Sequence, residues 1–203
     1  HEFGHALHNL LSATRYVAQG GTNVLLDFVE APSQMLEDWV YDPRVLKLFA
    51  EVCKTCKQVP PKLLARADRA RHFGKGILVS RQHLYASYDL ALHAHGSAEP
   101  MALWARMEGA TPLGHVAGSM FPASFGHVAG GYAAGYYSYL WSLVLAEDLR
   151  TAFAADKLDA KVGRRYRDIV LANGGQASPQ DLMQQFLGRP SDNKAFFKAL
   201  NKE

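Results

Sequence analysis

The chain has 203 residues, of which 48% are hydrophobic and 20% charged, so it is long and apolar enough to bury a sizeable core. Its net charge is only +3, and both signs are mixed along the chain, which argues against nucleic acid as a partner. No apolar run reaches the roughly 20 residues that a membrane span requires, so we expect no membrane partner either.

Helical periodicity dominates the sequence. A first helix is expected from the first residue to about residue 17, and Gly20–Thr22 then breaks the pattern. Asp42 and Pro43 suit the N-cap and first turn of a later helix, and Ser178 starts another in the same way. The expected helices cover about 1–17, 27–41, 43–59, 61–73, 75–95, 99–108, 136–156, 159–172, 179–187 and 191–201. The sequence therefore predicts one all-α domain.

Two stretches between and within these helices have an unusual composition. Residues 110–135 are rich in Gly, Ala, Ser and Pro and predict a long, mostly irregular loop. Long loops in compact domains are usually functional or disordered, and the aromatic residues and histidines here argue against disorder. The densest basic run, residues 62–76, is interpreted as a solvated helix face, with an anionic ligand or a partner surface as the alternative.

The two cysteines of the chain, Cys53 and Cys56, form a C-x-x-C pair. Such a pair can be redox active or half of a zinc site, but no second pair is present to complete a site of four cysteines. The flanking residues are typical of a helix. We therefore expect two ordinary thiols on a helix and, by default, a reducing compartment.

The first five residues, HEFGH, have the spacing of a metal site. On an α-helix, residues four apart lie one turn along the same face, so His1 and His5 can offer two imidazoles to one zinc ion. Glu2 lies about 100° round the helix from His1, where a general base can take a proton from zinc-bound water. The alternative is a pair of histidines on an ordinary helix.

A catalytic zinc ion needs a third protein ligand, and the helix expected over 27–41 offers one. Asp27, Glu30, Gln34 and Glu37 form a polar stripe on a helix that is otherwise apolar, and unpaired charges are costly to bury. Glu30 is the candidate ligand, and Asp27 and Glu37 could accept the remaining ring N–H groups of the histidines from outside the metal's own ligand set. The alternative is a capping box in which Glu30 binds backbone at the start of its helix.

Four segments of the chain resemble the thimet oligopeptidase family of zinc metallopeptidases. They are HEFGHALHNLLS, GGTNVLLDFVEAPSQMLEDWV, MFPASFGHVAGGYAAGYYSYLWS and NGGQASPQDLMQQFLGRP, which together run along essentially the whole chain. The second and third are far more specific than H-E-x-x-H alone. The resemblance implies the helical catalytic domain of a zincin-type oligopeptidase over residues 1–203, with a glycine-rich loop at about 110–135.

The resemblance also implies roles for individual residues. His1, His5 and Glu30 match the three ligands of one Zn²⁺ ion, and Glu2 matches the general base. The expected reaction is hydrolysis of short peptides with zinc-bound water as the nucleophile. In the loop, the expected catalytic residues are Tyr132 and Tyr139, and the expected substrate-binding residues are His127, Gly130, Gly131 and Tyr136. Without the resemblance, tyrosines at helical spacing would more often belong to a core.

Members of the family carry several hundred further residues before this motif, which form the opposite wall of a channel for short peptides. The chain is therefore expected to be the C-terminal catalytic part of a larger peptidase, in the cytoplasm or, alternatively, in an organelle. By itself it is expected to fold, to bind zinc poorly, to be inactive and to self-associate through exposed apolar surface that the missing N-terminal part would cover. The competing hypothesis is a non-catalytic helical fragment or scaffold.

Overall fold

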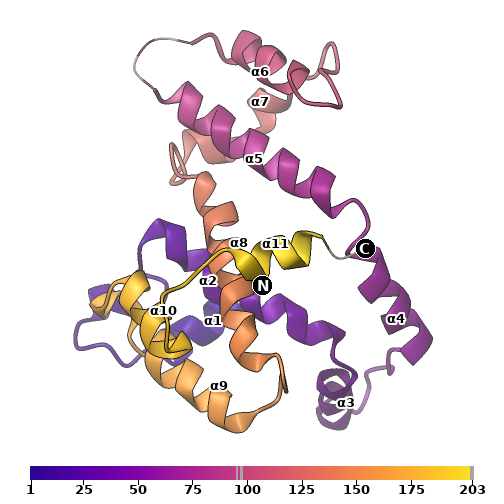
Figure 1. Cartoon of the computed structure of the whole chain (residues 1–203), viewed down its shortest axis with the longest axis vertical. Helices are drawn as coiled ribbons and strands as arrows, with labels where there is room; N and C mark the ends of the chain where they lie inside the picture. The colour runs from indigo at the N-terminus through magenta and orange to yellow at the C-terminus, as the bar shows by residue number, and fades with distance from the viewer. Residues whose placement is uncertain (95, 97, 202–203) are drawn as a thin grey trace. The chain divides into compact units, whose positions relative to one another are not determined.

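The computed structural model describes residues 1–94, 96 and 98–201, and its regular elements are helices joined by turns and loops (Figure 1). No strand occurs among these residues, so the predicted all-α class is confirmed. None of the helices in this described part is long and apolar enough to cross a membrane.

The bounds of the elements follow the expected pattern, with shorter helices in several places. The α-helices are α1 (Glu2–Leu10), α2 (Leu26–Leu36), α3 (Pro43–Val52), α4 (Pro61–Ala70), α5 (Lys75–Leu92), α6 (Pro100–Gly109), α7 (Phe121–Ser124), α8 (Tyr137–Arg150), α9 (Ala160–Tyr166), α10 (Pro179–Leu187) and α11 (Lys194–Leu200). Single turns of tighter or wider helix are η1 (Val17–Gln19), η2 (Glu37–Tyr41), η3 (Gly126–Ala129), η4 (Thr151–Phe153), η5 (Arg167–Leu171) and η6 (Gly174–Gln176).

Residues of the chain form two compact units. Unit 1 comprises residues 1–75 and 141–203, and unit 2 comprises residues 76–140. The reason is that the apolar residues form two separate clusters, and the second cluster belongs to unit 2 alone. Length and composition allowed either one unit or two, and no linker in the sequence marks the boundary.

Unit 1 is built around α2. Phe28, Ala31 and Met35 are fully buried and lie at spacings of three and four residues, so they form one apolar face of the helix. This face packs in a core with side chains of α8 and α10, such as Leu149 and Phe186. Because α2 is fixed by this core, any polar side chain on its other faces has a defined position.

Unit 2 has a core of aromatic side chains from α5, α6 and the segment that follows α6. Tyr85 stacks on Phe121 with ring centroids 4.7 Å apart, and Tyr88 meets Trp104 edge-on at 5.2 Å. Phe125 contacts both Phe121 and Tyr136, with ring centroids 5.0 Å and 4.9 Å away. The loop predicted over 110–135 therefore contains two short helical turns, α7 and η3, and is held by aromatic packing.

The first helix is shorter than expected, because the chain leaves the helix after Leu10. The N–H of Ala13 donates to the carbonyl of Ala172 at 2.9 Å, so it no longer continues the helix. Further on, the left-handed Gly21 (φ 56°) packs against Asn9, where a Cβ atom would lie 2.1 Å from the amide oxygen of Asn9. This return of the chain onto α1 has no local sequence signal.

The prediction of two free thiols on a helix is wrong. Helix α3 ends at Val52, and Cys53 and Cys56 form a disulfide in the turn that follows. The C-x-x-C spacing occurs both in helices and in turns, so the spacing alone does not tell free thiols from a disulfide. The inference of a reducing compartment from these residues therefore loses its basis.

The predicted helix starts at Asp42 and Ser178 are confirmed. The Asp42 carboxylate accepts from the N–H of Arg44 at 2.9 Å, and Pro43 occupies the first turn. The Ser178 hydroxyl accepts from the N–H of Asp181 at 3.1 Å, and Gly188 ends α10 in the left-handed conformation. Caps depend on neighbours within three residues, which is why the sequence predicts them well.

Candidate metal centre

Helices α1 and α2 approach each other closely at Gly4, the glycine inside HEFGH. A Cβ atom on Gly4 would lie 2.6 Å from Cα of Ser33, which is closer than real contacts allow. Only glycine therefore permits this approach. Gly4 lies between His1 and His5 along α1, so the same close contact brings both histidines to α2.

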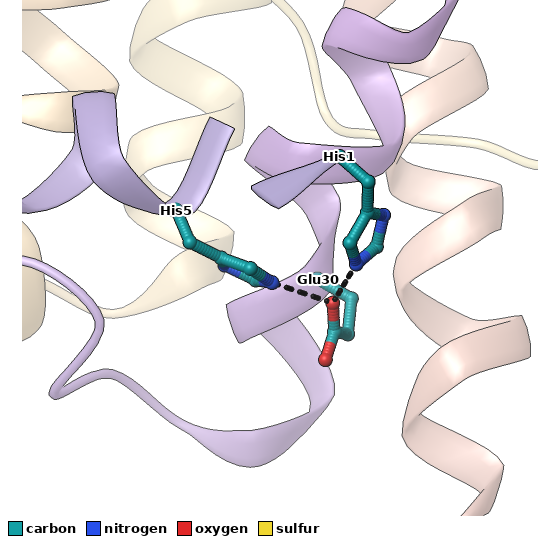
Figure 2. Close-up of side chains that lie close together, drawn as sticks. All are labelled: His1, His5 and Glu30. Carbon is teal, nitrogen blue, oxygen red and sulfur yellow. Dashed lines mark ion pairs between the residues drawn. The ribbon is translucent and has the colours of Figure 1, made fainter. Parts of the chain in front are cut away.

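His1 and His5 converge on Glu30 of α2 (Figure 2). Nε2 of His1 and Nε2 of His5 each lie 3.1 Å from the same oxygen, Oε2 of Glu30. The two rings are nearly perpendicular, with centroids 5.0 Å apart. One ligand atom from each residue lies within 4.8 Å of those from the other two.

This geometry fits a zinc ion. Zinc binds imidazole nitrogen and carboxylate oxygen at about 2.0–2.2 Å in a tetrahedral arrangement, in which neighbouring ligand atoms are about 3.3 Å apart. The two 3.1 Å separations between the histidine nitrogens and Glu30 are close to that value. Three protein ligands also leave the fourth position of the tetrahedron for water or substrate, as in catalytic zinc sites.

Glu30 is positioned by its own helix. The residue is 3% exposed, and the hydroxyl of Ser33 lies 3.2 Å from Oε2 while donating to the Glu30 carbonyl at 2.9 Å. The alternative reading of Glu30 as part of a capping box is wrong, because α2 starts with Leu25 as N-cap and Glu30 lies in its second turn. A buried carboxylate between two imidazoles is suited to a cation.

Of the two acidic residues predicted to hold the histidine rings, the structure brings one to them. Oε1 of Glu37 lies 2.6 Å from Nδ1 of His1, on the side of the ring away from Glu30. Burial raises the pKa of the Glu37 carboxyl above its usual range. In the described part of the chain, no hydrogen bond or ion pair joins the Asp27 carboxylate to either ring, and Asp27 instead lines a groove beside Trp141. Its predicted role as a support for an imidazole therefore has no geometric basis.

The histidines have further ring nitrogens inside the protein. Nδ1 of His5 is buried, and it has no hydrogen-bond partner within the described part of the chain. His8, one turn further along α1, is 0% exposed. Neither of its ring nitrogens has a hydrogen-bond partner within the described residues. Burial lowers the pKa of His8 to about 4, with a smaller contribution from His5, so His8 is neutral at pH 7.

Glu2 lies in the first turn of α1 and is exposed. One helical step of about 100° separates it from His1, so it does not point in the same direction as the two histidines. It is therefore free to act on a molecule near the cluster without joining the ligand set.

The loop residues singled out in the sequence form one cluster of rings in unit 2. Tyr132 and Tyr139 are stacked with centroids 5.0 Å apart and planes 19° from parallel. His127 meets Tyr132 at 5.7 Å and Tyr136 at 5.1 Å, and Tyr136 meets Tyr139 at 5.1 Å. The structure thus brings the predicted histidine and all three predicted tyrosines together.

The members of this cluster differ in burial. Tyr136 is buried, which raises the pKa of its phenol, and its hydroxyl donates to Oε1 of Gln82 at 3.1 Å. His127 is exposed, and Tyr132 and Tyr139 are half-buried. A Cβ atom on Gly131 would meet nothing within 4 Å, so the backbone before Tyr132 has open space around it.

Sequence reasoning missed several residues that shape these two clusters. Gly4 and Ser33 act through a contact between helices, and no local pattern announces it. His8 carries a weak signal, because it lies three residues after His5 on the same helix. Gln82 is an ordinary polar residue in a helix and has no signal at all.

The fold and the first cluster define the class of protein. An all-α fold that presents two histidines one turn apart, with an intervening glutamate and a carboxylate from a second helix, has the ligand set of a metal-dependent hydrolase. The chain belongs to peptidase family M3, whose pattern matches residues 1–202. The resemblance seen in the sequence is thereby confirmed.

Several peptidases are similar to this chain over nearly its whole length. Saccharolysin of Saccharomyces cerevisiae is 36% identical over 208 residues, which cover 98% of this chain and 29% of saccharolysin. Oligopeptidase A of Escherichia coli is 34% identical over 199 residues, with 93% and 29% covered. The probable cytosolic oligopeptidase A of Arabidopsis thaliana is 37% identical over 204 residues, with the same coverage. The chain thus spans about 29% of the length of these relatives.

Proposed function

We propose that this chain supplies the catalytic centre of a zinc metallopeptidase that hydrolyses short peptides. The observation that carries the proposal is the convergence of His1 and His5 on the buried carboxylate of Glu30. These three residues would hold the zinc ion. When bound, the zinc supplies a Lewis acid that polarises the scissile carbonyl and lowers the pKa of water at the site.

Glu2 is the general base in this proposal. Its carboxylate takes a proton from the water that attacks the carbonyl carbon, and the C–N bond breaks as the proton passes to the leaving amine. Glu37 keeps the ring of His1 in place through the 2.6 Å contact with Nδ1. The exposed position of Glu2 supports this division, because the base must reach water and substrate.

The resemblance to the family assigns further groups of the reaction to the ring cluster of unit 2. Negative charge develops on the carbonyl oxygen in the transition state, and a phenol hydroxyl directed at it stabilises that charge. We assign this role to Tyr132 and Tyr139, and substrate binding to His127, Tyr136 and the Gly130–Gly131 segment. The stacking of Tyr132 on Tyr139 supports a shared role for the two hydroxyls.

The substrates and the setting are also proposals, because the chain covers about 29% of its relatives. The names of the relatives include oligopeptidases, which supports short peptides as substrates. They also include a probable cytosolic enzyme and an organellar one, and of these locations we propose the cytoplasm.

The test is hydrolysis of a short quenched fluorescent peptide by the whole protein, meaning the complete protein that carries this sequence. We expect cleavage that a chelator abolishes and that stoichiometric zinc restores. The variant Glu2→Gln should keep its zinc and lose turnover, whereas Glu51→Gln, at an exposed glutamate of α3, should behave like the parent. A whole protein that binds zinc and cleaves no peptide would support the scaffold hypothesis instead.

A further inference from the structure

Asp89 of α5 is a buried carboxylate that the proposed mechanism does not use. It is 0% exposed, and it binds the backbone of the segment that carries the tyrosines. Oδ1 accepts from the N–H of Ala134 at 3.1 Å, and Oδ2 accepts from the N–H of Tyr136 at 2.9 Å. His93 directly follows the last residue of α5, and its Nδ1 lies 3.1 Å from Oδ1 of Asp89.

The backbone that Asp89 binds has an unfavourable conformation. Ala134 has a φ of 54° and is the one non-glycine residue in the left-handed region within the described part of the chain. A Cβ atom in this region collides with neighbouring backbone, so the conformation persists only where the surroundings impose it. The two bonds to the Asp89 carboxylate are such a constraint, because hydrogen bonds to a charged acceptor are stronger than neutral ones.

Two more residues of α5 hold the same segment. Oε1 of Gln82 accepts a hydrogen bond from the hydroxyl of Tyr136 at 3.1 Å. The ring of Tyr85 meets the ring of Tyr136 edge-on, with centroids 6.0 Å apart. Positions 82, 85 and 89 fall within about 60° on a helix, so a single face of α5 makes all of these contacts.

The segment before Ala134 is held differently. A Cβ atom on Gly131 would meet nothing within 4 Å, and one on Gly130 would meet only the carbonyl oxygen of Gly126, at 3.4 Å. The two glycines therefore have room on the side where a Cβ atom would lie, whereas the bonds to the Asp89 carboxylate begin at Ala134. Tyr132 lies between these glycines and Ala134, and Tyr136 and Tyr139 come after Ala134.

We propose that Asp89 is a positioning residue for the peptidase reaction: it fixes Ala134 and Tyr136 so that the tyrosine cluster keeps its geometry. Gln82 assists by holding the hydroxyl of Tyr136. This inference rests on the proposed function, because it assumes that Tyr132 and Tyr139 stabilise the transition state. Misplacement of such groups by about 1 Å can cost a hundredfold in rate.

The test compares Asp89→Asn with the parent in the whole protein. The amide of asparagine offers one acceptor oxygen, so one of the two backbone N–H groups loses its bond. We expect hydrogen exchange at Ala134 and Tyr136 to accelerate about tenfold or more. We also expect kcat to fall about tenfold or more while KM changes by less than about threefold.

The matched control is Asp148→Asn, which changes an equally buried carboxylate that binds Arg189 and the N–H of Asp192 in unit 1. It should lower thermal stability and leave exchange at Ala134 and Tyr136 unchanged. If Asp89→Asn does not fold, Gln82→Met carries the test, because it removes only the acceptor of the Tyr136 hydroxyl from a half-buried site. It should lower kcat/KM severalfold, because Tyr136 is one of the residues assigned to substrate binding.

Three results would contradict either the role of Asp89 or the proposed function. Unchanged exchange at Ala134 and Tyr136 in Asp89→Asn would overturn the inference, whatever the activity. Faster exchange with a normal kcat would also overturn it, reducing Asp89 to a role in folding while the proposed function stands. A parent protein without peptidase activity would refute the proposed function itself, and the kinetic part of the inference with it.

Discussion

The substitution Gly4→Ala tests whether the close approach of α1 and α2 builds the metal centre. The added Cβ atom would lie 2.6 Å from Cα and 3.2 Å from Cβ of Ser33. An ordinary contact between carbon atoms is about 3.5–4.0 Å, so α1 must move away from α2 by about 1 Å. His1 and His5 move with it, and Glu30 stays with α2.

The expected effect on zinc is larger than the effect on stability. Overpacking costs about 1–3 kcal/mol, but alanine gains about 1 kcal/mol over glycine inside a helix, so the free energy of unfolding should change little. Zinc–ligand distances, in contrast, hold within about 0.2 Å, so a shift of about 1 Å removes at least one ligand from bonding distance. We expect zinc affinity to fall at least a hundredfold, since even residues that only support ligands contribute 10–100-fold.

The assay is competition for zinc against a chromophoric chelator, with thermal unfolding measured on the same metal-free samples. The control is Gly163→Ala in α9 of the same unit, where a Cβ atom would meet nothing within 4 Å. This variant should be slightly more stable and should bind zinc like the parent. If Gly4→Ala also bound zinc with unchanged affinity, the argument that this glycine sets the ligand geometry would be refuted.

Three further predictions concern the base, the loop and a buried histidine. Glu2→Gln should retain about one zinc ion per chain and lose turnover; release of zinc would show that Glu2 is a ligand. Tyr139→Phe should lower kcat about 10²–10³-fold with little change in KM, and an unaltered kcat would assign Tyr139 to packing. His8 has its pKa lowered by burial to about 4 from 6.5, so the unfolded state binds more protons and the metal-free protein should lose stability as the pH falls from about 6.5 to 4. The loss is about 1.4 kcal/mol per pH unit, and equally steep acid unfolding of His8→Leu would contradict this assignment.

The sequence was most informative where function depends on local spacing. His1 and His5 lie four residues apart on a helix, so their convergence on one point follows from helical geometry. Glu30 needed more, because its helix was predicted but its distance from α1 was not. The resemblance to a known family supplied that pairing, and the structure shows the contacts that make it possible.

The remaining features depend on contacts between distant residues, and the sequence could not provide them. The contact of Gly4 with Ser33 joins segments about 30 residues apart, and the contact of Asp89 with Ala134 joins segments about 45 residues apart. Neither contact is marked by a sequence pattern. Asp89 reads as an ordinary charged residue on a helix until its burial is known. The early end of α1 has the same cause, because the N–H of Ala13 donates to the distant carbonyl of Ala172 and not to a carbonyl of the preceding helical turn.

The zinc content of the whole protein tests the central claim most directly. Mass spectrometry of the dialysed parent should give about one zinc ion per chain. The same measurement should give almost none for Glu30→Ala and about one for Glu51→Ala, whose exposed carboxylate on α3 serves as the matched control. A parent without zinc, or a Glu30→Ala variant that keeps its zinc, would contradict the assignment of His1, His5 and Glu30 as the metal centre.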